Sequence, residues 1–213
     1  MAKNKKLPPF FSSKDQKAAT DKRTKLYRLC NGIKDDFKVN YKLPTEAQAT
    51  QQLKFGMATS FAHQLKQMIN IGLKSKTKKM TAINFSTRQI LQNAIVGEYP
   101  QLKIDYAKVI ISDGSLDMLK NCHAVTTVDG CLILTWEQDP YAGKNVSGDD
   151  LIFLTVYNMT KNVCHNYPGA AKRSEMVLNM PLPYFSNDDT YHCWIFMAST
   201  NLRLMSTSTY YLL

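Results

Sequence analysis

The chain has 213 residues, of which 44% are hydrophobic, so it is long enough to bury a core in one large domain or two small ones. Its apolar runs are far shorter than the roughly 20 residues that a membrane-spanning helix needs. The basic N-terminus lacks the apolar segment of a signal peptide, so we expect a protein with no membrane contact that folds in a cytoplasm.

The net charge of +10 is concentrated in the first 79 residues. Residues 1–44 carry +8 and residues 45–79 carry +5, whereas residues 80–121 are neutral and residues 122–213 carry −3. Such asymmetry indicates a basic segment that faces either a polyanion or an acidic surface on a neighbouring subunit.

Residues 1–43 have the composition of a basic extended arm rather than of a domain. The stretch 14–29 is rich in Lys, Asp, Gln and Thr and has few apolar positions, so it cannot bury a core alone. Apolar and polar residues then alternate over 37–43, which predicts a short strand with a basic outer face. A strand of this kind commonly adds to a sheet, either its own or a neighbour's.

The most fully specified element is a long amphipathic helix from Thr45 to Ile71. A capping box of Thr45 and Gln48 marks its start, and Gly72 is a candidate for the C′ residue. Its length is roughly 40 Å at 1.5 Å per residue, so we expect part of it to pack on another chain. Apolar residues spaced mostly three or four apart predict one continuous stripe, formed by Leu53, Met57, Phe61, Leu65, Met68 and Ile69. The first four of them, Leu53, Met57, Phe61 and Leu65, are candidate interface residues.

A polar loop joins this helix to a second helix predicted over 82–96, with Thr81 as its cap and Gly97 at its end, so that the two form an αα-hairpin. A bent strand is predicted over 102–111. The loop is either a solvated connection or a contact for nucleic-acid phosphates or an acidic partner, and no motif supports sequence-specific readout. Its candidate contact residues are Lys74, Lys76, Lys78 and Lys79.

From about Asn121 onward the pattern is one of strands alone. Seven short strands bounded by Gly, Pro, Asn or Asp are predicted, at 124–128, 131–136, 152–158, 163–167, 175–179, 190–199 and 206–212. This spacing looks like an Ig-like or fibronectin type III-like β-sandwich. The predicted fold class is therefore α+β, with an arm (1–43), a helical hairpin and bent strand (44–120) and a sandwich (121–213).

The sixth of these strands is apolar on both faces, whereas a sandwich strand normally has one polar face. One face carries His192, Trp194, Phe196 and Ala198, and the other carries Tyr191, Cys193, Ile195 and Met197. Either a helix or the N-terminal segment covers the additional apolar face, or that face is a subunit contact. The second alternative makes Tyr191, Ile195 and Met197 candidate interface residues.

No motif in the sequence defines a reaction. Three His–Cys neighbours occur, but adjacent residues in a strand point to opposite faces, so each pair could supply only one ligand to a metal. The five cysteines are widely spaced and without a Cys-x-x-Cys, which favours free thiols. Nucleophile elbows, zinc-protease motifs and phosphate-binding loops are absent from the sequence. We therefore expect no catalytic residues, no metal, no cofactor and no small-molecule substrate.

Many short motifs spread over residues 44–213 resemble an uncharacterised family of Bacteroidetes and their phages, described only as a domain of unknown function. They are Pro44-Thr45-Glu46-Ala47-Gln48, Lys54-Phe55, Ile69-Asn70-Ile71-Gly72, Lys79-Met80-Thr81-Ala82, Ile104-Asp105-Tyr106, Ser112-x-Gly114-Ser115-Leu116, Trp136, Val156-Tyr157-Asn158 and Ser206-x-Ser208-x-Tyr210. Residues 1–43 depart from the family, which usually begins with a Gly-rich segment containing Trp-Lys-Gly. The family is also similar to small proteins encoded among phage structural genes.

The resemblance and the oversized helix lead to the expectation of a non-enzymatic structural or assembly protein. It would be a bacteriophage virion component of the neck, tail or portal-proximal region, made in the host cytoplasm. It would form homo-oligomers and contact other structural proteins, with non-specific DNA contact through the basic arm as a further expectation. The alternative is a cytoplasmic, non-specific nucleic-acid-binding protein of a Bacteroidetes host. A surface adhesion module is a third interpretation, which the missing signal peptide disfavours.

Overall fold

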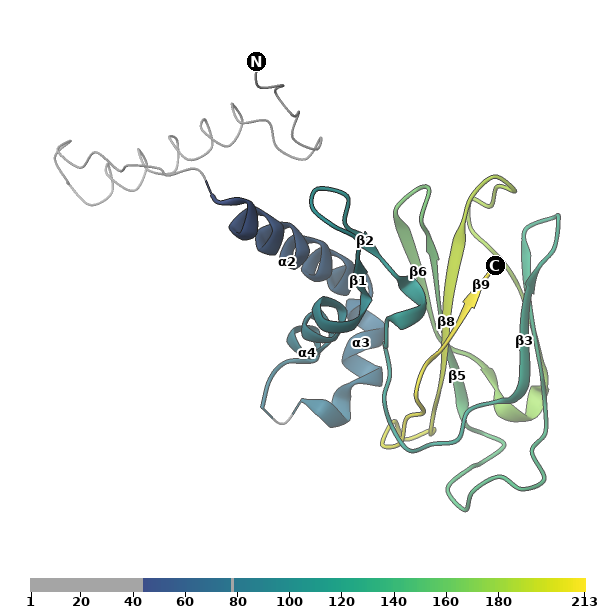
Figure 1. The fold of residues 1–213 in the computed structure, drawn as a ribbon. Helices are drawn as coiled ribbons and strands as arrows, with labels where there is room; N and C mark the ends of the chain where they lie inside the picture. The colour runs from purple at the N-terminus through teal and green to yellow at the C-terminus, as the bar shows by residue number, and fades with distance from the viewer. Residues whose placement is uncertain (1–43, 78) are drawn as a thin grey trace, which may run out of the picture. The chain divides into compact units, whose positions relative to one another are not determined.

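The computed structural model describes residues 44–77 and 79–213 (Figure 1). The predicted arm, the strand expected at 37–43 and Lys78 lie outside the described residues. The described part combines helices α2, α3 and α4 with three antiparallel sheets, which confirms the α+β prediction.

Helix α2 (Glu46–Gln64) begins with the predicted capping box. The Thr45 N–H donates to Gln48 Oε1 at 2.9 Å, and the Gln48 N–H donates to Thr45 Oγ1 at 3.3 Å. The prediction of one helix to Ile71 is wrong, because the backbone leaves helical geometry at Leu65 (φ −89°, ψ 7°) before α3 (Lys66–Gly72) continues. The Ile69 N–H still donates to the Leu65 carbonyl at 3.0 Å, so the interruption is confined to one turn.

Helix α4 (Ala82–Gln89) has the predicted cap, since Thr81 Oγ1 accepts from the Asn84 N–H at 3.2 Å. The prediction that this helix reaches Val96 is wrong. The chain passes through a π-helical turn (Ile90–Ala94) into β1 (Ile95–Val96), where two β-branched residues precede a glycine with φ +92°.

The predicted bent strand is also shorter in the structure. Strand β2 (Lys103–Ile104) pairs with β1 in a two-stranded sheet, and a 3₁₀ turn (Tyr106–Lys108) follows it. The remainder of the predicted strand, as far as Ile111, is an irregular segment that leads to the larger sheets.

Two larger sheets follow. The first has the order β3-β4-β7, formed by β3 (Lys120–Thr126), β4 (Cys131–Glu137) and β7 (Val177–Pro181). The second has the order β6-β5-β8-β9, formed by β6 (Val163–Lys172), β5 (Leu151–Asn158), β8 (Tyr191–Ala198) and β9 (Thr209–Leu212). Strands β3 and β4 pair antiparallel around the turn at Asp129-Gly130, a dipeptide typical of β-hairpins.

The four-stranded sheet is the middle of three layers (Figure 1). On one side it shares a core with the three-stranded sheet, which contains Leu132, Leu134, Trp136, Ile152, Leu154, Cys193, Ile195 and Met197. On the other side it shares a core with the helices, which contains Phe61, Leu65, Met68, Ile69, Phe153, Tyr157, Trp194 and Phe196. The helices and the sheet therefore depend on each other for burial of apolar surface.

Strand β8 has no exposed face as a result. Tyr191 is 4% exposed, and Ile195 and Met197 are fully buried beneath the three-stranded sheet. Helices α2 and α3 cover the opposite face, so the alternative of a central strand covered by a helix is the one found. This corrects the prediction that Tyr191, Ile195 and Met197 contact a partner, because they are core residues of their own chain.

A buried junction ties the end of α3 to the connection between β8 and β9. Ser112 Oγ lies 3.2 Å from the Gly72 carbonyl and 2.6 Å from the Ser206 carbonyl, while Ser208 Oγ accepts from the Ile111 N–H at 3.1 Å. A Cβ on Gly72 would lie 2.5 Å from the Ile111 carbonyl oxygen. Gly72 is thus inside α3 and is required for close approach, rather than as the C′ residue that the sequence predicts.

Candidate interaction surfaces

The apolar stripe of α2 does not all face the core. At about 100° per residue, each step of four residues advances about 40° around the helix, so Leu53 and Leu65 are about 120° apart. Phe61 and Leu65 are buried against the four-stranded sheet, whereas Leu53 and Met57 stay half-buried and outside both cores. Phe61 and Leu65 are therefore corrected to core residues. Leu53 and Met57, which we call the α2 facet, remain candidates for an interface.

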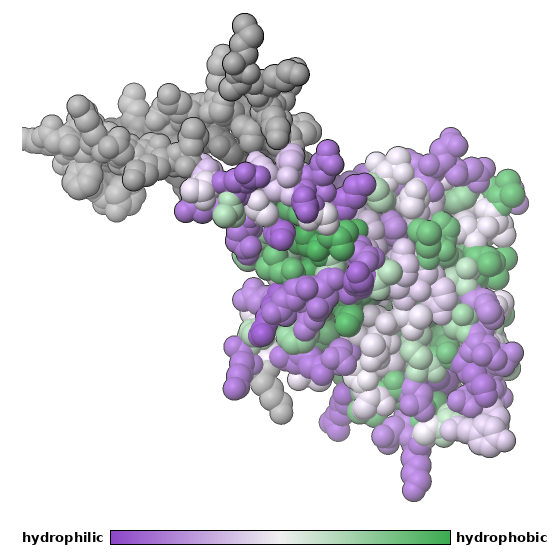
Figure 2. Space-filling model, viewed as in Figure 1, coloured by the Kyte–Doolittle hydropathy of each residue, from purple (hydrophilic) through white to green (hydrophobic). Residues whose placement is uncertain are grey.

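Phe55 lies on the opposite flank of the same part of α2, and 55% of its surface is exposed. Figure 2 shows that apolar side chains gather over the region of α2 and α4, between polar patches. An exposed Phe on one flank of α2 and two half-buried apolar side chains on the other are more apolar surface than a solvated helix needs. This part of α2 can therefore bury further surface against another chain.

The lysines after α3 are exposed, as expected for either interpretation of the loop. Lys74, Lys76 and Lys79 are all exposed, and Lys76 Nζ lies 2.8 Å from Asp113 Oδ2. Lys78 is outside the described residues. Met57 lies in α2, whereas Lys74 begins the 3₁₀ turn that follows α3, beyond the interruption at Leu65. We therefore treat the α2 facet and the lysines as two separate surfaces.

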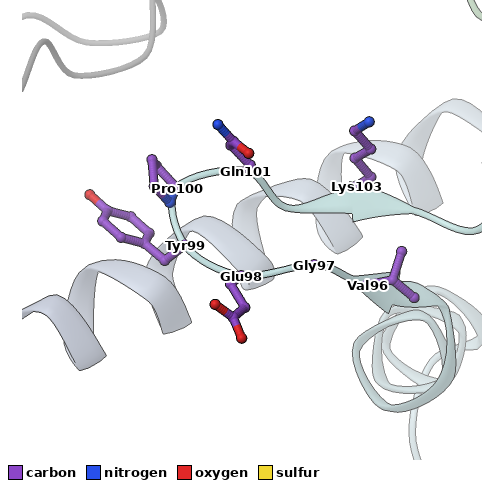
Figure 3. Close-up of a pocket in the computed structure, with 7 residues that line it drawn as sticks. All are labelled: Val96, Gly97, Glu98, Tyr99, Pro100, Gln101 and Lys103. Atoms are coloured by element: carbon purple, nitrogen blue, oxygen red, sulfur yellow. The ribbon is translucent and has the colours of Figure 1, made fainter.

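A pocket lies at the turn between β1 and β2, lined by Val96, Gly97, Glu98, Tyr99, Pro100, Gln101 and Lys103. Figure 3 shows that Tyr99, Gln101 and Lys103 project outward from the turn while Glu98 points the other way. Chemistry or specific ligand binding requires polar groups that converge on one point. The side chains that line this pocket do not converge in this way, so it suggests no ligand.

An aromatic cluster surrounds His192 on the face of the four-stranded sheet that the helices cover. The imidazole Nδ1 lies 2.8 Å from Tyr210 Oη, and the ring centroid lies 4.1 Å from that of Tyr106. Within the described residues, His192 Nε2 and Trp194 Nε1 are buried without a hydrogen-bond partner. Burial lowers the pKa of His192, because the apolar surroundings disfavour its charged form.

The pKa of His192 makes the stability of the fold sensitive to mild acid. The folded state favours neutral imidazole, so its contribution is complete above the unfolded pKa of about 6.5 and is lost as the pH falls below that value. We expect the melting temperature to fall between pH 7.5 and 5.5, and we expect His192→Gln to reduce that fall. The same substitution at exposed His123 is the control. Equal pH dependence in the wild type and His192→Gln would contradict the role of His192.

A second polar network fixes one end of the two larger sheets. Asp189 Oδ2 lies 2.7 Å from Lys161 Nζ and accepts from Asn158 Nδ2 at 2.8 Å. The hydrogen bond from Lys161, which has the larger effect, and the one from Asn158 both lower the pKa of Asp189. The hydroxyl of Tyr191 accepts from the Ser186 N–H at 3.0 Å, five residues upstream. The network is structural, since every group has a partner within it.

The described residues contain no assembled metal site and no disulfide. No group of three or more His, Cys, Asp or Glu side chains in residues 44–77 and 79–213 is placed to hold a metal ion. Cys122, Cys131, Cys164 and Cys193 are free thiols, and burial raises the pKa of Cys164 to about 12. A thiol that keeps its proton at neutral pH is a packing residue rather than a nucleophile.

The geometry defines a class of mixed α+β proteins in which helices, a four-stranded sheet and a three-stranded sheet form three layers. The chain belongs to the family of unknown function DUF6266, which it matches over residues 34–212. A search of curated proteins finds none that matches the chain. No helix of the described part is long and apolar enough to span a membrane.

Proposed function

We propose that this chain is a non-enzymatic structural protein that assembles with copies of itself and with other structural proteins. We place it in a bacteriophage virion, in the neck, tail or portal-proximal region, after synthesis in the host cytoplasm. The resemblance of its motifs to an uncharacterised family of Bacteroidetes and their phages supports this setting. The observation that carries the assembly role is the α2 facet, Leu53 and Met57, which neither core buries.

We further infer that the seven strands β3–β9 form a β-sandwich of the fibronectin type III or Ig-like kind. The sheet of β3, β4 and β7 faces the sheet of β6, β5, β8 and β9. This division of seven consecutive strands between two sheets resembles that of fibronectin type III modules. Tyr191 begins the sixth strand two residues before Cys193, and its hydroxyl bonds to backbone upstream, as in the tyrosine corner of Ig-like domains. Such a module is a rigid support, and its fold alone assigns no activity.

The α2 facet has the size of an anchor rather than of a whole interface. Covering the exposed parts of Leu53 and Met57 would contribute about 1–2 kcal/mol. Apolar anchors of this kind account for much of the affinity in protein interfaces, while surrounding contacts exclude water. The facet thus supports association that also uses surface beyond α2.

A charged double substitution tests the α2 facet. We expect Leu53→Asp with Met57→Asp to form smaller complexes than the wild type at equal concentration, because two carboxylates would have to be desolvated in the contact. Light scattering on the purified full chain measures the mass. Gln52→Asp, at an exposed position of the same helix, is the matched control. The assembly role of the α2 facet fails if the double variant and the control have the same mass as the wild type.

A second candidate function is non-specific nucleic-acid binding in the cytoplasm of a Bacteroidetes host. It is favoured by the exposed Lys74 and Lys79, which have no ion-pair partner within the described residues, beside Lys76. Lysine contacts to phosphates would give an affinity for duplex DNA that falls steeply with salt. The same lysines are equally suited to an acidic patch on a neighbouring protein, so this candidate ranks second.

A further inference from the structure

Three of the four outer strands of the larger sheets carry features that block pairing with another chain. Strand β7 contains Pro181, β6 contains Pro168 followed by Gly169 at φ +66°, and β3 has a bulge after Lys120 with Asn121 at φ +47°. Prolines, bulges and lysines are the usual means by which native proteins protect the edges of sheets. These three edges are therefore poor templates for a further strand.

Strand β9 is the fourth outer strand and has none of these features. Its residues, Thr209, Tyr210, Tyr211 and Leu212, are uncharged and include no proline and no bulge. Leu212 is 63% exposed. Figure 1 shows β9 at the margin of its sheet, next to β8. Among these four edges, β9 alone lacks a proline, a bulge and a charge, so only its length of four residues limits pairing.

The backbone direction along β9 follows from its pairing with β8. The Leu213 N–H donates to the Tyr191 carbonyl at 3.0 Å, and Leu212 lies opposite His192. Because hydrogen-bonded and non-hydrogen-bonded pairs alternate in an antiparallel ladder, the N–H and C=O groups of Tyr210 and Leu212 point away from β8. The next residue of the same parity, Ser208, already donates to the Ser112 carbonyl. Within the described residues, the open edge is thus the stretch from Tyr210 to Leu212.

We propose that this edge pairs with the same edge of a second copy of the chain, antiparallel and about a two-fold axis at Tyr211. Tyr210 of each copy would then lie opposite Leu212 of the other, and their outward groups would form four backbone hydrogen bonds. The pairing joins two four-stranded sheets into one of eight strands. A second copy is the occupant that fits, because the spacing of donors and acceptors is self-complementary and no like charges of the two strands meet.

Because the pairing involves only a few residues of each copy, we expect its affinity to be low. A contact of two residues per copy falls in the small class of interfaces, below about 1,200 Å², that are transient in solution. We therefore expect a dissociation constant in the micromolar range or weaker, and dimers that depend on concentration. This inference does not rest on the α2 facet, which lies on a different element.

The substitution Leu212→Pro tests edge pairing without disturbing the pairing of β9 with β8. Leu212→Pro removes an N–H that points away from β8, so the ladder to β8 keeps its bonds. Leu212→Ala removes the same side chain but keeps the N–H. Both are made in the Leu53→Asp, Met57→Asp background, so that association through α2 does not contribute. We expect Leu212→Ala to remain a dimer of twice 24.2 kDa in sedimentation, and Leu212→Pro to dissociate at least tenfold more readily.

Two results would overturn the inference. The first is an unchanged dimer, or no dimer at all, in sedimentation of both variants at high concentration. The second is a Val39→Pro variant that dissociates as readily as Leu212→Pro. That result would mean that residues 37–43 of another copy, and not its β9 strand, pair with the edge. Hydrogen exchange on the wild type gives an independent readout that does not depend on a substitution folding. We expect the amides of Tyr210 and Leu212 to gain protection as concentration rises, and constant exchange would contradict the pairing.

Discussion

Replacing Gly72 by alanine is expected to lower the melting temperature by about 4–8 °C, the equivalent of about 2 kcal/mol. The new Cβ would lie 2.5 Å from the Ile111 carbonyl oxygen and 2.6 Å from Ser112 Cβ. Both neighbours are held by the junction with Ser206 and Ser208, so neither can yield without loss of hydrogen bonds. Thermal unfolding monitored by circular dichroism measures the effect.

Gly56 provides the matched control in α2. A Cβ built there meets no atom within 4 Å, so Gly56→Ala should gain helix propensity and raise stability by about 1 kcal/mol. The two substitutions are chemically identical and should move the melting temperature in opposite directions. A Gly72→Ala variant as stable as the wild type would show that the junction does not constrain the end of α3.

Replacing Asp150 by asparagine is expected to cost about 3 kcal/mol, because it removes the buried counter-charge of a largely buried guanidinium. Asp150 is 2% exposed, and its Oδ2 lies 3.5 Å from Arg173 Nε. Burial lowers the pKa of Arg173, since its charged form is desolvated. Arg173 also donates to the carbonyls of Asp117 and Met118 at 2.6 and 3.2 Å. The pair thereby fixes the segment that leads into β3.

The adjacent residue gives the control for this prediction. The side chain of Asp149 is 66% exposed and lies 3.0 Å from Lys172 Nζ, so Asp149→Asn should change stability by less than about 0.5 kcal/mol. Urea unfolding of the two variants compares the same chemical change in a buried and a solvated ion pair. Equal effects at the two positions would remove the distinction and contradict the structural role of Asp150.

Signals confined to a few residues predict the fold well. The capping residues Thr45 and Thr81 start their helices where the sequence indicates, and the Asp129-Gly130 turn joins β3 to β4. These features depend on local hydrogen bonds and backbone preferences, which the sequence carries directly. Mixed helix and sheet is therefore readable without the structure.

Features that depend on packing between distant segments could not be predicted from the sequence. The stripe of α2 looked continuous because a spacing of four residues is helical, yet its rotation sends Leu53 and Met57 away from the core. The two apolar faces of β8 were visible, but the sequence did not say that a sheet covers one and helices cover the other. The pattern predicts a helix at Ile95 and Val96 because a short apolar run fits either structure, but in the fold these residues pair with β2 as a strand.

The candidate sites divide in the same way. The sequence identified the α2 facet and the exposed lysines, since each lies within one continuous segment. It missed the cluster of Tyr106, His192 and Tyr210, whose members are separated by up to 104 positions and meet only in the folded chain. Tyr106 and Tyr210 both lie in motifs that carry the family resemblance, and that coincidence was the available signal.

Sedimentation equilibrium of the full chain over a wide concentration range tests the assembly role most directly. We expect a mass that rises with concentration above the 24.2 kDa of one copy, because association through the α2 facet or the β9 edge joins copies of the chain. A constant mass of 24.2 kDa at every concentration, with or without salt, would contradict self-assembly through either surface.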